Sequence, residues 1–189
     1  VDAGLIEDVN HYSVEEEQVV WDDIVENNIY VICNTPMAAR ITERTLLGFR
    51  DISQCHIKEE KLVKRALTNR EELVIEINTL GYWEDSNNKT KMNFDAIVGN
   101  PPYQLMGGSG GNNDAPIFQY FCDIAHRVTK NYVSIIIPAR WFAAGRENLL
   151  GDFRREMLNC GHVQQMTAFV NNKEVFDNVE IKGGVCFYL

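Results

Sequence analysis

The sequence has no apolar run long enough to cross a lipid bilayer. Its longest apolar stretch, from Tyr132 to Pro138, already contains a serine, and it is far shorter than the roughly 20 residues that a membrane-spanning helix needs. The N-terminus is acidic, whereas a secretory signal begins with basic residues and continues with an apolar segment. The sequence therefore predicts neither a membrane span nor a signal peptide.

Basic residues are also scarce. Lys and Arg together number 18 against 27 Asp and Glu, which gives a formal net charge of -9. A protein that binds nucleic acid by itself normally carries a basic face, and this charge balance has the wrong sign for one. Any phosphate contacts would therefore come from a local patch that the sum conceals or from a segment outside this sequence.

The cysteines lack a pairing pattern. They are odd in number, widely spaced and never arranged as C-x-x-C: Cys33, Cys55, Cys122, Cys160 and Cys186. Such thiols are typical of a reducing compartment. We interpret them as reduced and mostly buried, in a cytoplasmic protein.

Length and composition predict one globular domain. The chain has 189 residues, of which 45% are apolar and 24% charged, close to the average for globular proteins. The first residue is Val1 rather than Met, and the last residues, 182–189, stop inside an apolar run that predicts a strand. We expect a single domain over residues 1–189 that is a piece of a longer protein.

The first half of the chain predicts alternating helices and strands. Ser13 followed by Glu16 is a capping box, and Asn34-Thr35-Pro36 supplies an N-cap and a first-turn proline. In chain order we expect a helix over 14–27, a strand over 29–33, a helix over 36–47, a helix over 58–70, a strand over 72–80 and a loop over 84–91.

The second half repeats the alternation. We expect a buried strand over 94–98, a helix over 116–129, a strand over 132–137, a helix over 146–159 and strands over 162–170 and 184–189. Strands that alternate with helices of this length indicate βαβ units, hence an α/β fold with a mostly parallel sheet covered on both faces. The last two strands have no helix between them, which predicts an antiparallel edge.

One motif has the residues that chemistry at a strand end requires. Asn100-Pro-Pro-Tyr103 directly follows the expected strand over 94–98, and ligands of open α/β sheets bind at the carboxyl ends of strands. The two prolines remove backbone donors and leave carbonyls as acceptors. An amine on an aromatic ring would find the Asn100 side-chain oxygen and the Pro101 carbonyl as acceptors, with the Tyr103 ring available for stacking. Two such acceptors make the nitrogen more nucleophilic.

The sequence around this motif resembles a known family. Phe94-Asp-Ala-Ile-Val-Gly-Asn-Pro-Pro-Tyr-Gln104 is similar to the catalytic motif of N6-adenine DNA methyltransferases of restriction-modification systems, of the type II or IIG kind. The segment Tyr132-Val-Ser-Ile-Ile-Ile-Pro-Ala-Arg-Trp-Phe142 and the segment Glu174-Val-Phe-Asp-Asn-Val-Glu-Ile-Lys-Gly-Gly-Val-Cys-Phe-Tyr188 are similar to later parts of these enzymes. The resemblance covers residues 94–189, the catalytic half of such a protein.

The resemblance implies both a fold and a reaction. The fold is a Rossmann-like sheet of S-adenosylmethionine-dependent methyltransferases, incomplete at its N-terminus. The reaction is methyl transfer from S-adenosylmethionine to the N6 amine of an adenine flipped out of double-stranded DNA. Asn100, Pro101, Pro102 and Tyr103 are the implied catalytic residues, and Tyr103 and Phe176 the implied aromatic contacts of the base. No metal is implied.

The upstream sequence departs from the family pattern. These enzymes have a strand and a glycine-rich turn for the methionine part of the cofactor, and no such turn precedes Ile29. The glycine cluster over 107–111 follows the catalytic motif, so we interpret it as a loop beside the site. The family places an acidic residue at the end of the next strand, where Cys33 stands here, and another acidic residue near the cofactor adenine. Cys33 and Asp85, or Glu84 in place of Asp85, are therefore the cofactor candidates.

Several polar residues have simpler interpretations. Asp114 is interpreted as a helix N-cap. Arg140, Arg146 and Lys182 are expected on loops or strand ends near the DNA face, where isolated cations are usually only solvated.

Two other functions stay open. The motif also occurs in methyltransferases that modify a protein glutamine or an RNA amine, and Cys33 favours a non-catalytic module that retains only the fold. If the chain is a DNA enzyme, we expect double-stranded DNA as its partner, a target-recognition domain elsewhere in the protein and a fused or separate endonuclease.

Overall fold

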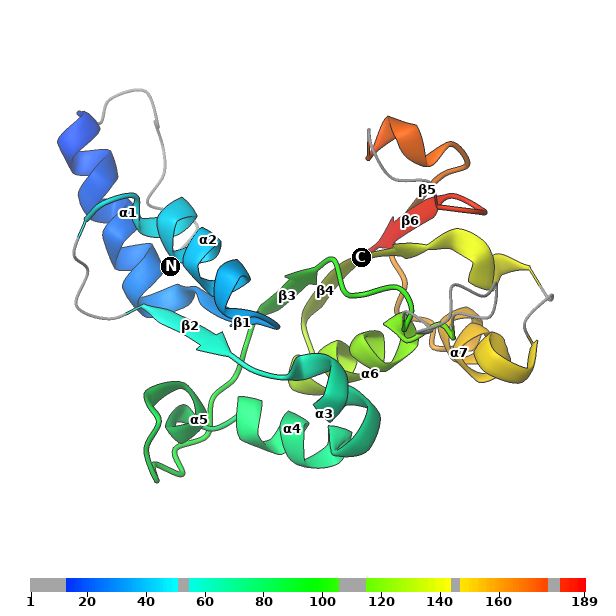
Figure 1. Ribbon diagram of the computed structural model, residues 1–189, viewed down its shortest axis with the longest axis horizontal. Helices are drawn as coiled ribbons and strands as arrows, with labels where there is room; N and C mark the ends of the chain where they lie inside the picture. The colour runs from blue at the N-terminus through cyan, green and yellow to red at the C-terminus, as the bar shows by residue number, and fades with distance from the viewer. Residues whose placement is uncertain (1–12, 51–54, 106–114, 144–146, 177–180) are drawn as a thin grey trace. The chain divides into compact units, whose positions relative to one another are not determined.

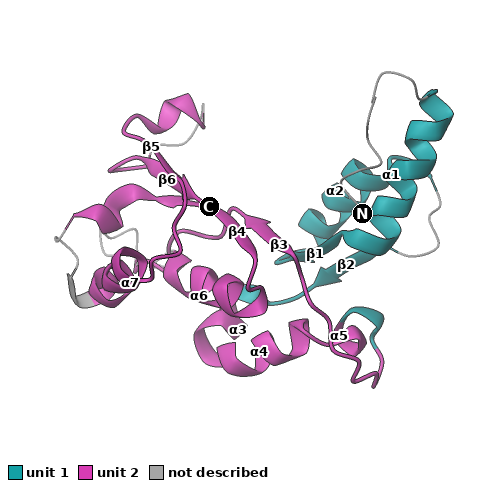
Figure 2. Ribbon diagram, turned by 180° about the vertical axis from the view of Figure 1, so that it is seen from behind, with its two compact units in different colours: residues 1–62, 83–85 teal, residues 63–82, 86–189 magenta. Residues whose placement is uncertain are grey.

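The computed structural model describes residues 13–50, 55–105, 115–143, 147–176 and 181–189. Contacts divide the chain into two compact units, which Figure 2 shows in different colours. Unit 1 comprises residues 1–62 and 83–85, and unit 2 comprises residues 63–82 and 86–189. Each unit has its own sheet, and a single domain over the whole chain stays a prediction.

Up to residue 59, the described part of unit 1 forms two helices and a pair of parallel strands. Its elements in chain order are α1 (Val14–Asn28), β1 (Tyr30–Cys33), α2 (Pro36–Leu47) and β2 (His56–Glu59). The capping box of α1 is confirmed: the Ser13 hydroxyl accepts from the Glu16 amide at 3.3 Å, and the Ser13 amide donates to the Glu16 carboxylate at 2.8 Å. Thr35 caps α2 by accepting from the amide of Ala38 at 3.2 Å. Strong local signals thus set both helix starts.

The segment between the two sheets corrects two predictions. The expected helix over 58–70 is partly wrong, because its first residues belong to β2 and a break at Asn69 separates α3 (Leu62–Thr68) from the helix that begins at Arg70. The expected strand over 72–80 is wrong, because the chain forms α4 (Arg70–Ile77) and α5 (Leu80–Glu84). The buried residues of α4 are Leu73, Val74 and Ile77, whose spacing of three and four residues suits one face of a helix. The alternation of apolar and polar residues over 72–77, which had indicated a strand, therefore does not mark one here.

Unit 2 contains a four-stranded sheet in the order β3-β4-β6-β5. The strands are β3 (Ala96–Gly99), β4 (Tyr132–Pro138), β5 (Met166–Phe169) and β6 (Val185–Tyr188). Strands β3 and β4 are parallel, whereas β6 runs antiparallel to both β4 and β5. The predicted α/β class and the antiparallel edge are confirmed (Figure 1).

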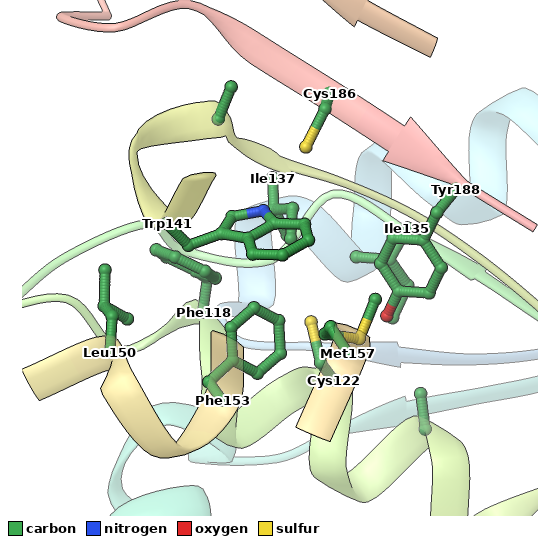
Figure 3. Close-up of a cluster of buried hydrophobic side chains, with 12 residues drawn as sticks. Phe118, Cys122, Ile135, Ile137, Trp141, Leu150, Phe153, Met157, Cys186 and Tyr188 are labelled. Atoms are coloured by element: carbon green, nitrogen blue, oxygen red, sulfur yellow. The ribbon is translucent and has the colours of Figure 1, made fainter. Parts of the chain in front are cut away.

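The core of unit 2 lies between this sheet and two helices, α6 (Phe118–Val128) and α7 (Glu147–Asn159). Figure 3 shows the buried hydrophobic side chains of this core. Among them is Trp141, from the short 3-10 helix η2 (Ala139–Phe142). The ring of Phe153 stands edge-on to Trp141 at 5.5 Å and to Phe118 at 5.7 Å, measured between ring centroids. Trp141 is only 2% exposed, so the segment that follows β4 is anchored in the core.

Strand β3 does not have the burial that was expected of it. Ile97 packs against the core, but Val98 points to the other face of the sheet and is 78% exposed. The prediction of a buried strand over 94–98 is therefore wrong for this face.

Candidate active site

Four chain segments of unit 2 meet one edge of its sheet. The register aligns Pro138 with Val185 and Val185 with Phe169, so β4 and β5 end where β6 begins. Strand β3 runs parallel to β4 and ends at the same edge. The edge therefore receives residues 100–104 after β3, residues 139–142 after β4, residues 170–176 after β5 and residues 181–184 before β6 (Figure 1).

The Asn-Pro-Pro-Tyr motif lies at this edge, as the sequence predicts. Asn100 follows β3 directly, and its side chain is exposed. Pro102 is exposed as well, and Pro101 is half-buried. Proline has no N–H, so these two residues contribute only carbonyl acceptors to the loop. The motif thus places accessible hydrogen-bond acceptors, the Asn100 side-chain oxygen and the proline carbonyls, at the end of a strand.

Tyr103 is more deeply set than a surface stacking residue. Its ring is half-buried, and its hydroxyl is buried without a hydrogen-bond partner among the described residues. Burial, with a smaller effect from nearby Cys186, raises the pKa of Tyr103 to about 12. The Tyr103 carbonyl accepts from the Ile117 amide at 3.1 Å. The residue is therefore fixed to the start of α6, and its hydroxyl stays protonated at neutral pH.

Phe176 reaches the same edge from the other end of the strand order. It follows β5 and the short helix η4 (Asn172–Glu174), and its amide donates to the Asn172 carbonyl at 2.8 Å. Asn172 is 7% exposed, and Phe176 itself is half-buried. The topology thus brings Phe176 to the edge that carries Asn100, as a second aromatic wall of the base site requires. Contact of Phe176 with a base stays a prediction.

A glycine turn fastens this edge. Gly183 and Gly184 have φ angles of +89° and +77°, a region that only glycine adopts without strain. A Cβ on Gly184 would lie 2.1 Å from the Phe169 carbonyl oxygen. The Gly184 carbonyl accepts from the Ala139 amide at 3.0 Å. The Gly-Gly pair is therefore required for the turn to pack against the segments after β4 and β5.

Cys33, the first cofactor candidate, ends β1 in unit 1. It is 6% exposed, and its Sγ lies 3.5 Å from the Thr42 hydroxyl oxygen on α2. The thiol thus faces a helix of its own unit. The backbone carbonyl of Cys33 accepts from the Glu60 amide at 2.9 Å, which keeps the end of β1 against the end of β2.

Glu59 is the residue that the sequence analysis missed. It is the last residue of β2, it is exposed, and it is the register partner of Cys33. The sequence did not point to Glu59 because the segment 58–70 was expected to be a helix, so no strand end was expected at residue 59. The short alternation of His56-Ile-Lys-Glu59 was the available signal. An accessible carboxylate therefore does stand at the carboxyl edge of the unit 1 sheet.

Asp85, the second cofactor candidate, is held by a neighbouring lysine. Its carboxylate forms an ion pair with Lys58 of β2, one residue before Glu59, and the Asp85 side chain is 82% exposed. Asp85 has a φ of +51°, which Asp tolerates better than most residues. Glu84, the alternative to Asp85, is the last residue of α5. Thus Cys33, Glu59 and Asp85 belong to one unit, and the pairing with Lys58 links Asp85 to the strand that ends in Glu59.

Some candidates lie outside the described residues: the glycine cluster over 107–111, Asp114 and Arg146. Lys182 is exposed in the turn before β6. Within the described ranges no three His, Cys, Asp or Glu side chains are close enough to hold a metal ion. No helix in those ranges combines the length and the apolar character needed to span a membrane.

A cavity of about 440 Å³ lies in unit 2, away from the motif. Its lining includes Tyr132, which begins β4, and Leu189, which follows β6, so it opens at the sheet edge opposite to Asn100. His126 in its wall has a Nε2 atom 3.0 Å from the Tyr188 hydroxyl, and burial lowers the pKa of His126. The cavity is therefore not part of the candidate site around Asn100.

Comparison with known proteins finds methylases. A curated relative from Mycoplasma pneumoniae, described as an uncharacterized adenine-specific methylase, is 39% identical over 100 residues. The aligned region covers 52% of this chain but only 24% of the relative, so the chain spans about a quarter of that protein's length. A family model described as Eco57I restriction-modification methylase matches residues 27–176. That range includes β1, the Asn-Pro-Pro-Tyr motif and Phe176, and the chain accordingly belongs to the Eco57I restriction-modification methylase family.

Proposed function

We propose that the protein containing this chain is an adenine-specific DNA methyltransferase of a restriction-modification system. The observation that carries the proposal is the exposed Asn100 at the carboxyl end of β3, followed by two prolines and a half-buried Tyr103. Membership of the methylase family supports the same reaction. The substrate is double-stranded DNA in the cytoplasm, and a target-recognition domain and an endonuclease are further expected parts of the system.

The motif residues act on the amine of the flipped adenine. The Asn100 side-chain oxygen and the Pro101 carbonyl each accept a hydrogen bond from the N6 amine. These acceptors stabilise the positive charge that develops on nitrogen as the N–C bond forms and the S–C bond of the sulfonium breaks, after which the nitrogen releases one proton to solvent. Pro102 keeps the loop rigid, because its ring fixes one backbone angle. Tyr103 and Phe176 stack on the base, an interaction that every base offers through its flat face.

The residues of unit 1 fit part of the cofactor. S-adenosylmethionine supplies an electrophilic methyl group on a sulfonium, and its ribose hydroxyls and adenine amine are hydrogen-bond donors. The exposed Glu59 carboxylate matches such donors, because a charged acceptor forms the stronger hydrogen bonds. Asp85 offers a second carboxylate, whose charge is partly offset by Lys58. Cys33 ends the neighbouring strand β1, but its thiol is not a charged acceptor.

Methyl transfer to DNA tests the proposal. The full-length protein is incubated with S-adenosylmethionine carrying a tritiated methyl group and with DNA from a host that lacks adenine methylation. We expect N6-methyladenine among the nucleosides of the product. Asn100→Ala should lower transfer by roughly 10²-fold or more, as single polar stabilisers often contribute that much. Cofactor affinity, measured by calorimetry, should barely change.

Asn131→Ala is a matched control for this experiment. Asn131 precedes β4 at the opposite edge of the sheet, where its side-chain amide donates to Asp95 at 3.2 Å, and its loss should leave transfer intact. Near-normal transfer by a folded Asn100→Ala protein would make the motif merely structural. Methylation of RNA or of a protein glutamine in place of DNA would instead move the proposal to another substrate.

A further inference from the structure

Arg140 lies where two parts of the candidate site meet. It follows β4 in the short helix η2, at the sheet edge that also carries Asn100. Its Nη2 atom donates a hydrogen bond to the side-chain oxygen of Gln104 at 3.0 Å. Gln104 comes directly after Tyr103 in the chain, so the guanidinium is tied to the residue beside the aromatic ring of the motif.

The backbone around Arg140 is fixed on both sides. The preceding residue, Ala139, donates to the Gly184 carbonyl at 3.0 Å, and the following residue, Trp141, is 2% exposed in the core. A Cβ on Gly183 would lie 3.6 Å from the Cβ of Arg140, so the glycine turn packs closely against the arginine. The backbone of Arg140 is therefore fixed, and its guanidinium donates from a defined place.

Gln104 also belongs to a short pairing with the start of α6. It forms a bridge with Pro116, and the Leu105 amide donates to the Ala115 carbonyl at 3.1 Å. The Ile117 amide donates to the Tyr103 carbonyl, again at 3.1 Å. Backbone pairing thus holds one side of the motif, and the bond from Arg140 holds the Gln104 side chain.

We propose that Arg140 is a positioning residue for the reaction. Its hydrogen bond to Gln104 locks the loop that carries Asn100 and Tyr103 against the end of β4 and the glycine turn, so that Tyr103 is presented to the base in one orientation. This inference rests on the proposed methyltransferase function. Arginine suits the task because its planar, permanently charged fork loses little freedom for each hydrogen bond formed. The positive charge also makes the bond to an amide oxygen stronger than a neutral one.

Variants at both ends of the contact test this role in the full-length protein. Arg140→Ala and Gln104→Leu each remove the bond and should lower kcat for methyl transfer by about tenfold, with the KM for DNA little changed. The double variant should lose no more than either single one, because both remove the same interaction. Gln104→Glu keeps an acceptor and should retain activity. Thermal melts confirm folding, and Arg155→Ala, an exposed arginine paired with Asp152 on α7, is the control.

Amide hydrogen exchange gives a readout that does not depend on activity. Loss of the bond should speed exchange at Leu105 and Ile117, whose amides pair across the loop, while the control arginine variant leaves both unchanged. Unchanged exchange in Arg140→Ala would overturn the proposal. If the unaltered protein methylates no DNA, the proposed function fails, but the exchange result still decides whether Arg140 holds the loop.

A direct contact of Arg140 with DNA phosphate would produce a different pattern. Arg140→Ala would then raise the KM for DNA, Arg140→Lys would restore it, and Gln104→Leu would have no effect. Those results would overturn the positioning role and show that Arg140 binds DNA phosphate.

Discussion

Cys33 and Glu59 stand opposite each other as register partners at the carboxyl ends of the parallel strands β1 and β2. The thiol is buried with its sulfur 3.5 Å from the Thr42 hydroxyl oxygen, whereas the carboxylate is exposed. An exposed carboxylate on β2 thus lies beside a strand end whose own thiol offers no charged acceptor. The adjacent strand therefore has to be included when a candidate cofactor site is judged.

The first prediction concerns these carboxylates. In the full-length protein, Glu59→Gln should weaken S-adenosylmethionine binding by about tenfold, which is about 1.4 kcal/mol, because a charge-assisted hydrogen bond becomes a neutral one. Asp85→Asn should weaken it less, since Lys58 already offsets part of the charge of that carboxylate. Cys33→Ala should change affinity little. Calorimetric titration measures all three, and an Asp85→Asn loss that exceeds the Glu59→Gln loss would reverse the assignment.

The second prediction concerns the glycine turn. Gly184→Ala should lower the free energy of unfolding by roughly 3 kcal/mol or more, because a strained φ and a clash with the Phe169 carbonyl add together. Gly161 is a matched control, with a φ of +67° but open space around its Cβ position. Gly161→Ala should cost only about 1 kcal/mol. Urea unfolding compares them, and equal losses would show that backbone strain alone matters at Gly184.

Local signals in the sequence were enough for most helices and for the motif. Ser13 with Glu16 defined the start of α1, and Thr35-Pro36 defined the start of α2. The strand-to-loop position of Asn100 also followed from the sequence, because an apolar run before Asn-Pro-Pro has few alternatives. These features depend on neighbours within a few residues.

Features that depend on distant partners were predicted poorly. Strand β2 is a four-residue segment whose pairing with β1 comes from residues about one helix away in the chain. The apolar residues of α4 fit a strand and a helix about equally in sequence, and packing decides between them. The exposure of Val98 depends on what covers that face of the sheet, which no local pattern encodes. The bond from Arg140 to Gln104 is likewise a product of the register between β3 and β4.

The third prediction concerns the buried thiols of unit 2. Burial raises the pKa of Cys122 to about 12 and that of Cys186 to about 11, from an ordinary value of 9.0. Folding thus favours the neutral thiols, and this stabilisation is complete below about pH 9 and is lost as pH rises through the folded values. The free energy of unfolding in urea titrations should therefore fall as the pH rises from about 9 through about 11.

Variants and thiol labelling separate this effect from general alkaline damage. Cys186→Ala should flatten the fall with pH, because the alanine cannot ionise. At pH 8 a maleimide should leave Cys122 and Cys186 unmodified, since both are 0% exposed and the thiolate is the reactive form. Rapid labelling of both in the folded protein would contradict the burial described for this core.

The last prediction separates the ring of Tyr103 from its hydroxyl. Tyr103→Phe should leave methyl transfer intact, because stacking needs only the ring, and should not lower the free energy of unfolding, because the lost hydroxyl is buried without a hydrogen-bond partner among the described residues. Tyr103→Ala should weaken capture of the flipped base by about 1 to 3 kcal/mol, the usual value of base stacking on an aromatic ring. Phe176→Ala should show a similar loss if that ring forms the second wall. The KM for DNA and a thermal melt of each variant provide the measurements, and a Tyr103→Phe protein that folds but transfers methyl groups as poorly as Tyr103→Ala would assign the hydroxyl a role in the reaction itself.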